Sequence, residues 1–552
     1  MPGDVRDLGA WDYVIVGAGS AGCVLANRLS ADPDMKVLLL EAGGRDDYIW
    51  IHIPVGYLYC MGNPRTDWGF KTAPEAGLNG RSLAYPRGRV LGGCSAINGM
   101  IYMRGQARDF DGWRQAGLEG WGWDDVLPLF RRAEDHYELS DDVHGQGGET
   151  RVEQQRLSWD ILDAVRDACE EIGIPKVDDF NRGDNFGSSY FHVTQRGGIR
   201  WTAAKGFLKP VAGRPNLKVV TGAQARRIVL GETGRAEAVE LTVDGVPAIA
   251  RANGEIILSA GAIGSPQLLE LSGIGDPKVL GKTGIETLVE APSVGGNLQD
   301  HLQIRTIFKV SNAVTLNERA GSLFGKARIA LEYALSRSGP MSMAPSQLGV
   351  FARSDPAFET ANVEFHVQPL SLDKFGEPLH PFPAITLSVC NLRPESRGSV
   401  HVVSPDAAAH PEIRPNYLAT AGDRQVAADS IRLARKVMAS DAMQAFSPRE
   451  HLPGALVRSD EDLARAAGDI GTTIFHPVGT CRMGSDEASV VDARLNVRGV
   501  PGLRVADASV MPTITSGNTA APTMMIAEKA AEMIRADRRA AMPAGRAASV
   551  GG

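Results

Sequence analysis

The sequence lacks a long basic run, a long apolar run and room for a leader before its first strand. Its 58 lysines and arginines are outnumbered by 65 acidic residues, giving a formal net charge of -7 over 552 residues. Because phosphate-backbone binding needs a basic patch, we do not expect nucleic acid as a partner. No apolar stretch reaches the roughly 18 residues of a membrane span. The first strand-like run begins at Asp12, too early for a signal peptide of about 15 to 30 residues, so we expect a cytoplasmic protein.

Cysteine is scarce and scattered. The six cysteines form no CxxC pair and share no ligand spacing with histidine. This pattern is typical neither of a disulfide framework nor of a zinc site, so we expect reduced thiols and no metal. The cysteines are Cys23, Cys60, Cys94, Cys169, Cys390 and Cys481.

Glycine is abundant, and its clearest cluster lies near the amino terminus. Residues 12–41 are typical of a strand, a tight turn, a helix and a second strand, with Gly17-x-Gly19-x-x-Gly22 in the turn and Glu41 closing the second strand. Such glycines permit a tight turn and close approach to a pyrophosphate, and the carboxylate can accept from ribose hydroxyls. The spacing therefore predicts a nucleotide-binding βαβ unit; the alternative is a plain glycine-rich turn.

A second feature favours FAD over NAD. A buried strand, 503–507, ends in Asp507 far down the chain and precedes a helix beginning near Thr519 to Pro522. Two-part flavin proteins commonly close the FAD site in this way, and the positive end of that helix would face the isoalloxazine. The alternative for Asp507 is a strand-terminal cap.

Four further stretches carry a family resemblance. They are 88–98 (GRVLGGCSAIN), 261–275 (GAIGSPQLLELSGIG), 297–301 (NLQDH) and 476–484 (HPVGTCRMG). In these motifs, over roughly residues 10–535, the sequence resembles the glucose-methanol-choline (GMC) oxidoreductases, most closely the bacterial choline dehydrogenase-like and aliphatic alcohol dehydrogenase branch.

The resemblance implies an α/β fold: a Rossmann-like FAD-binding domain of the GMC type and an α+β substrate domain built on an antiparallel sheet. The FAD-binding domain would comprise 10–155, 216–304 and 471–535, and the substrate domain 156–215 and 305–470, followed by a flexible tail at 536–552. Within these parts, the runs 217–220, 225–230 and 237–243 look like an antiparallel meander.

The resemblance also implies which residues bind FAD. Those near the pyrophosphate, ribose and adenine would be Gly17, Gly19, Ser20, Ala21, Gly22, Glu41, Ala42 and Ala225. Those near the flavin would be Val90, Gly93, Asn98, Gly99, Met100, Ile101, Asp507, Ala508, Asn518 and Thr519. Members with covalently attached FAD have a histidine immediately before the asparagine of this loop, where this chain has Ile97, so we expect dissociable FAD. Cys94 replaces a serine common in the family.

His476 matches the family's catalytic histidine and Asn518 its second active-site position. Oxidation of a primary alcohol to the aldehyde needs a base for the hydroxyl proton, here His476, while a hydride passes to flavin N5. Asn518 would bind the substrate oxygen. We expect His301 to support the flavin fold, and Arg104 and Arg200 to be structural or surface charges. A nucleophilic role for Cys481 lacks a supporting base.

The substrate and the electron acceptor are less sharply indicated. All eight tryptophans lie in the first 201 residues, whereas a choline headgroup usually needs an aromatic cage and often a carboxylate. Glu364 is available, but on a strand we expect it to face solvent. This favours neutral primary alcohols over choline.

The branch favours a quinone or other carrier as acceptor, with peripheral association at the inner membrane and homo-oligomer formation left open. The alternatives are a choline dehydrogenase, an oxygen-using alcohol oxidase, a hydroxynitrile lyase-like enzyme that keeps FAD without redox use, and a flavin-binding protein without catalysis.

Overall fold

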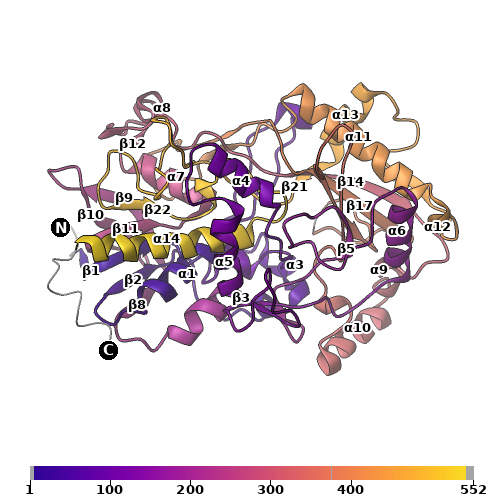
Figure 1. Cartoon of the computed structure of the whole chain (residues 1–552), viewed down its shortest axis with the longest axis horizontal. Coiled ribbons are helices and arrows are strands. Elements are labelled where there is room, and N and C mark those ends of the chain that lie inside the picture. Colours follow the sequence, from indigo (N-terminus) through magenta and orange to yellow (C-terminus); the bar gives the residue numbers. More distant parts are fainter. Residues whose placement is uncertain (1–4, 375, 542–552) are drawn as a thin grey trace.

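The structure, a computed structural model, describes residues 5–374 and 376–541. It is built on two seven-stranded sheets. Figure 1 places β1, β2, β8 and β11 in one half of the molecule and β14, β17 and β5 in the other. The predicted fold class, a Rossmann-like domain with a second domain on an antiparallel sheet, is confirmed.

The first sheet is mixed, with strand order β8-β2-β1-β11-β10-β9 and β22 paired to β11. β1, β2, β8, β11 and β22 run parallel, while β9 and β10 form an antiparallel extension of β11. The strands are β1 (Arg6–Val16), β2 (Val37–Leu40), β8 (Leu217–Val220), β9 (Ala223–Leu230), β10 (Ala236–Val243), β11 (Val246–Leu258) and β22 (Leu503–Val505).

Helices α1 (Ser20–Leu29) and α14 (Ala520–Ala541) pack against each other beside this sheet, as Figure 1 shows. β2 consists only of buried apolar residues, as expected for a strand covered on both faces. Arg28 on α1 joins Glu528 on α14 through an ion pair of 2.7 Å. Two segments from opposite ends of the chain thus form one layer.

The second sheet is antiparallel, with order β20-β14-β17-β16-β15-β5 and β21 paired to β14. Its apolar face packs on the helices α6 (Asp160–Glu171), α11 (Ala421–Met438) and α13 (Asp460–Ile470). The strands are β5 (Gly187–Tyr190), β14 (Leu302–Lys309), β15 (Leu348–Ala352), β16 (Val363–Gln368), β17 (Ala384–Asn391), β20 (Arg449–Leu452) and β21 (Gly471–Thr473).

The other principal elements surround these sheets. The helices are α4 (Ala107–Gln115), α5 (Trp123–Ala133), α7 (Gly261–Leu271), α8 (Pro277–Thr283) and α10 (Leu323–Ser336), with short turns α2 (Ile49–His52), α3 (Tyr57–Cys60), α9 (Leu316–Arg319) and α12 (Asp441–Gln444). The small strand pairs are β3 (Glu134–His136) with β4 (Thr150–Val152), β6 (Gln195–Arg196) with β7 (Ile199–Arg200), β12 (Ile274–Gly275) with β13 (Val289–Glu290), and β18 (Ser399–His401) with β19 (Glu412–Arg414).

Two local expectations need correction. The run 217–220 does not join a meander: as β8 it pairs in parallel with β2, and the Glu41 amide donates to the Val220 carbonyl at 2.8 Å. Residues 536–541 are helical, because α14 continues to Ala541. The rest of the expected tail, 542–552, lies outside the described residues.

Candidate active site

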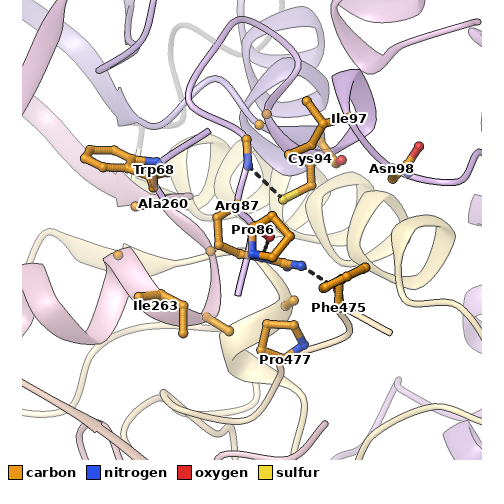
Figure 2. A pocket seen from close by; sticks show the side chains of 18 of the residues that line it. Trp68, Pro86, Arg87, Cys94, Ile97, Asn98, Ala260, Ile263, Phe475 and Pro477 are labelled. Carbon is orange, nitrogen blue, oxygen red and sulfur yellow. Dashed lines mark hydrogen bonds between the residues drawn. The ribbon is translucent and has the colours of Figure 1, made fainter. Parts of the chain in front are cut away.

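One large cavity lies between the two sheets and brings the predicted residues together. Every predicted cofactor and catalytic residue except Gly22 and Val90 lines it. The second sheet contributes Gln303, Arg305, His366 and Gln368 to its wall. Figure 2 shows part of this cavity, with Arg87, Cys94, Asn98 and Phe475 around it.

The glycine-rich turn forms a cradle with no space for side chains. A Cβ at Gly17, whose φ is +103°, would lie 2.5 Å from the Ser259 carbonyl oxygen. A Cβ at Gly93, with φ +51°, would lie 2.6 Å from the Cα of Gly19. The cradle opens at the first turn of α1, where free amides and the helix dipole favour a pyrophosphate. This geometry fits FAD.

Gly22, on α1, does not line the cavity but packs against a turn that does. Its Cβ would lie 1.8 Å from the Gly17 carbonyl oxygen. The absence of a side chain therefore lets α1 pack directly on the turn that follows β1, as the motif predicts.

Glu41 lines the cavity and also fixes two loops. Its Oε2 accepts from the Ala18 amide at 2.9 Å and its Oε1 from the Gly43 amide at 2.8 Å. Burial raises the pKa of Glu41 to about 7, and these backbone hydrogen bonds oppose the shift. The carboxyl group thus holds the glycine turn while one side of it faces the cavity.

Asp507 both lines the predicted FAD site and acts as a cap at the end of its strand, the two roles that the sequence left open. It follows β22 and lines the cavity. Its Oδ2 accepts from the Gly261 amide at 2.8 Å and from the Ser265 hydroxyl at 2.6 Å, while its Oδ1 caps Ser509. Burial raises the pKa of the Asp507 carboxyl.

The loop at 90–101 is held in place by buried residues outside the cavity lining. Val90 is buried and bridges to Gly44 instead of lining the cavity. Arg200 donates to the carbonyl and side-chain oxygens of Asn98 at 2.7 and 2.9 Å. Arg104, the other arginine considered structural or surface, pairs with Glu134 at 2.8 Å. Both arginines are fully buried, so they are structural and neither is a surface charge.

His476 and Asn518 meet at the cavity wall. The Asn518 Nδ2 lies 3.1 Å from His476 Nε2, and the Asn518 Oδ1 has no hydrogen-bond partner in the described part of the chain. His476 Nδ1 lies 3.1 Å from His301 Nδ1. His301 therefore contacts the predicted base itself and does not line the cavity, which refines its expected role as a support of the flavin fold.

The contacts of His301 fix the proton positions on both rings. His301 Nε2 lies 3.1 Å from the Leu392 carbonyl oxygen, which can only accept, so this nitrogen carries the proton. In a neutral imidazole the other nitrogen then accepts, so His301 Nδ1 accepts from His476 Nδ1. His476 Nε2 is therefore unprotonated and accepts from Asn518 Nδ2 at 3.1 Å, at the wall of the cavity.

Burial keeps His476 neutral. It lowers the pKa of His476 well below its usual value, and His301, His366 and Arg87 lower it further. Burial also lowers the pKa of His301, with a partly opposing effect of Glu364 and Asp300. The site therefore presents an unprotonated imidazole at neutral pH.

Asp300 holds both histidine segments in place. Its Oδ1 accepts from the amides of His301 and His476 at 2.9 and 2.8 Å. Its Oδ2 accepts from the hydroxyls of Tyr85, Tyr417 and Thr473 at 2.8, 2.5 and 2.6 Å. One buried carboxylate thus joins β14 to the segment that carries the predicted base.

Phe475, the residue before His476, has an uncommon backbone conformation. Its φ is +71°, a value that side chains other than glycine rarely adopt. Arg87 donates from Nη2 to the Phe475 carbonyl at 2.7 Å, the contact drawn in Figure 2. The strained turn is thus held from the cavity side.

The second sheet supplies residues that sequence reasoning missed. Gln303, Arg305, His366 and Gln368 occupy alternate positions on β14 and β16 and share one sheet face. The sequence pattern that could have revealed them is a polar residue at every second position of an otherwise apolar strand.

Two expectations about substrate binding are corrected. Glu364 is buried and does not face solvent: its Oε1 lies 3.2 Å from His366 Nε2 and its Oε2 3.9 Å from Cys390 Sγ. A tryptophan from the first 201 residues, Trp68, lines the cavity, stacked on Phe70.

Cys481 is fully buried, and burial raises the pKa of its thiol well above the usual value. A nucleophilic thiol needs the opposite shift and an exposed position. The structure therefore supports the rejection of a Cys481 nucleophile.

Comparison with known proteins identifies the class. Sequence profiles of GMC oxidoreductases match residues 11–303 and 394–527. The chain belongs to the GMC oxidoreductase family, and is an FAD-binding oxidoreductase.

Individual relatives cover nearly the whole chain. An alcohol dehydrogenase [acceptor] of Pseudomonas putida is 41% identical over 95% of each chain. An oxygen-dependent choline dehydrogenase of Vibrio vulnificus is 40% identical over 95% of this chain and 94% of its own. Among solved structures, pyridoxine 4-oxidase from Mesorbium loti superimposes with a TM-score of 0.87 at 33% identity, over 95% of this chain and 99% of its own. These relatives support flavin-dependent alcohol oxidation.

Proposed function

We propose that the protein oxidises a primary alcohol to the aldehyde, with His476 as base and Asn518 as the group that orients the substrate oxygen. The observation that supports this most directly is the His476 Nε2 lone pair beside the Asn518 amide at the cavity wall. A hydroxyl that replaces this hydrogen bond can donate its proton to His476 Nε2 and accept from Asn518 Nδ2.

Each of these residues has a separate role in the proposed reaction. FAD, when bound, accepts the hydride of the alcohol carbon. His476 takes the hydroxyl proton, and His301 accepts from its opposite ring nitrogen, which keeps the ring oriented. Asn518 stabilises the alkoxide character that develops on the oxygen. Asp300 fixes the backbone of both histidines, so His301 and Asp300 are positioning residues.

FAD would be held without a covalent bond. The loop position before Asn98 carries Ile97, an alkyl side chain that cannot attach to the flavin. Cys94 accepts from the Gly88 amide at 3.4 Å, a contact drawn in Figure 2. We therefore propose that denaturation releases the whole flavin.

We propose a quinone or other carrier as electron acceptor, with peripheral association at a membrane. In the described part of the chain, no helix is both long and apolar enough to cross a bilayer. Helix α10 exposes Leu323, Phe324 and Leu335, with 86, 82 and 79% of their surface accessible, beside Lys326 and Arg328. Figure 1 shows this helix at the edge of the second half. An apolar helix face with basic residues suits an anionic lipid surface, which cosedimentation with liposomes would measure.

An anaerobic titration tests the proposed reaction. Primary alcohols, with choline included, are added to the purified protein while the flavin absorbance is followed. We expect at least one primary alcohol to bleach the oxidised flavin, with one aldehyde formed per flavin. Readmitted air should restore the colour slowly and a quinone analogue rapidly; fast recovery with peroxide would instead indicate an oxidase. An unchanged flavin with every alcohol would contradict alcohol oxidation and direct attention to cyanohydrin cleavage.

The rate of flavin reduction should be insensitive to mild acid. A base works only while unprotonated, and the pKa of His476 lies well below its usual value of 6.5. The rate should therefore remain on its plateau at pH 6.5 and fall only at lower pH, as the depressed pKa is crossed. Stopped-flow reduction between neutral and acidic pH measures this. A half-maximal rate at or above 6.5 would contradict the assignment of a buried neutral imidazole.

A further inference from the structure

Arg305 extends from β14 to the wall of the cavity. Its side chain lines the cavity and is only 7% exposed. Neither its Nε nor its Nη2 forms a hydrogen bond within the described part of the chain. Burial lowers the pKa of Arg305 to about 10, and Tyr57 partly opposes this shift, so the guanidinium is charged at neutral pH.

No carboxylate at this end of the cavity balances that charge. Among the described residues, the acidic residues that line the cavity are Glu41 and Asp507. Both belong to the first sheet and are bonded to backbone amides there. Glu364 lies on the same sheet as Arg305 but not in the cavity lining, with His366 and Cys390 beside it. The cavity therefore holds an uncompensated positive charge.

Further unpaired polar groups share the sheet face of Arg305. Ser388 lies directly opposite Arg305 on β17, and His366 lies opposite Ser388 on β16. The Ser388 Oγ and the Gln368 Oε1 are buried without a partner among the described residues. Gln368 lines the cavity beside Arg305, whereas Ser388 lies behind the lining. Because buried polar groups in proteins are almost always hydrogen-bonded, the unpaired donors of Arg305 at the cavity wall mark the place of a polar ligand.

We propose that the substrate is an alcohol that carries a carboxylate, bound by the Nε and Nη2 donors of Arg305. This deepens the proposed function and rests on it. One free guanidinium matches the single charge of a carboxylate and can bind it through two parallel hydrogen bonds, whereas a phosphate monoester carries about 1.5 to 2 charges. A trimethylammonium group would be repelled, so choline does not fit this end of the cavity.

The spacing of the two groups sets the form of the substrate. His301, which contacts His476, precedes Arg305 by four positions as the chain enters β14. At about 3.3 Å per residue, their Cα atoms lie roughly 13 Å apart. Because the proposed base and Arg305 occupy different places on the cavity wall, we expect a substrate whose hydroxyl and carboxylate lie on separated carbons, as in an ω-hydroxy fatty acid or a hydroxymethyl-substituted aromatic acid.

The experiment compares ω-hydroxyhexanoate with its methyl ester and with hexanol in anaerobic flavin reduction. We expect kcat/KM of the acid to exceed that of the ester about tenfold to hundredfold, the range of a charge-assisted hydrogen bond. In Arg305→Met this preference should disappear, mainly through KM of the acid, while the ester is unaffected. Arg305→Lys should restore part of it. Arg449→Met, an exposed arginine on β20 of the same sheet and outside the cavity lining, is the matched control, and flavin content verifies the fold of each variant.

A binding measurement separates the two proposals. Hexanoate, which cannot be oxidised, should perturb the flavin spectrum of the wild-type protein and of Arg449→Met, with at least tenfold weaker binding in Arg305→Met. If no alcohol reduces the flavin but this difference persists, the anion site stands and alcohol oxidation fails. If hexanol and the ester react as well as the acid, or hexanoate binds equally in wild type and Arg305→Met, the carboxylate proposal is wrong while alcohol oxidation stands.

Discussion

Replacement of His476 by alanine should slow flavin reduction by at least about a hundredfold while FAD stays bound, because His476 is the imidazole in contact with Asn518 among the described residues that line the cavity. The truncation leaves the glycine cradle and the contacts of Glu41 and Asp507 untouched, so the flavin content should equal that of the wild type. Single-turnover reduction by a saturating alcohol measures the chemical step apart from reoxidation.

His451→Ala is a suitable control for His476→Ala. His451 lies on β20 at the far edge of the second sheet, half-buried and outside the cavity lining. It should reduce the flavin at the wild-type rate. Equal rates in both variants would remove His476 from the mechanism. A matching loss in His301→Gln, accompanied by a displaced pH profile, would show that the ring contact positions the base.

Substitution of Gly22 by alanine should yield protein with at least about tenfold weaker FAD binding. The added Cβ would lie 1.8 Å from the Gly17 carbonyl oxygen, so either α1 or the turn after β1 must move. Such overpacking costs about 1 to 3 kcal/mol, and the displaced atoms are those that cradle the pyrophosphate. The ratio of flavin to protein absorbance, after dialysis against buffer without FAD, measures the loss.

Gly44→Ala provides the matched comparison. A Cβ at Gly44 meets nothing within 4 Å, although this glycine lies close along the chain to the same site. Its flavin content and its thermal midpoint should remain those of the wild type. If Gly22→Ala also retained its flavin, the cradle would have to be more compliant than its contacts indicate.

The nucleotide half of the site could be predicted because its signals are local. Gly17 and Gly19 lie in one turn, and Glu41 and Asp507 each directly follow a buried strand. Parallel strands end at the same edge of a sheet, so these residues had to converge once the strands were recognised. The sequence motif around His476 predicts the proposed base in a comparable way.

The substrate half could not be predicted because it depends on pairing between distant strands. Arg305, Ser388 and His366 form one row across β14, β17 and β16, yet nothing in any one strand specifies its register with the others. The same limit explains Glu364, which is buried by its neighbours on the sheet. It also explains β8, which pairs in parallel with β2 while the chain around it reads as a meander.

The interleaving of the two sheets has a consequence for how the chain is made. β1 pairs in parallel with β11, whose residues Val246–Leu258 emerge from the ribosome long after it, and β22 and α14 come last of all. β1 can pair early with β2, but its other edge must wait for β11, an arrangement that slows folding and exposes an apolar edge. Because Asp507 and Asn518 line the cofactor cavity, the cavity is completed only after the segment that carries them has been synthesised. A chain truncated before Asp507 therefore lacks part of the cavity wall and should not capture FAD.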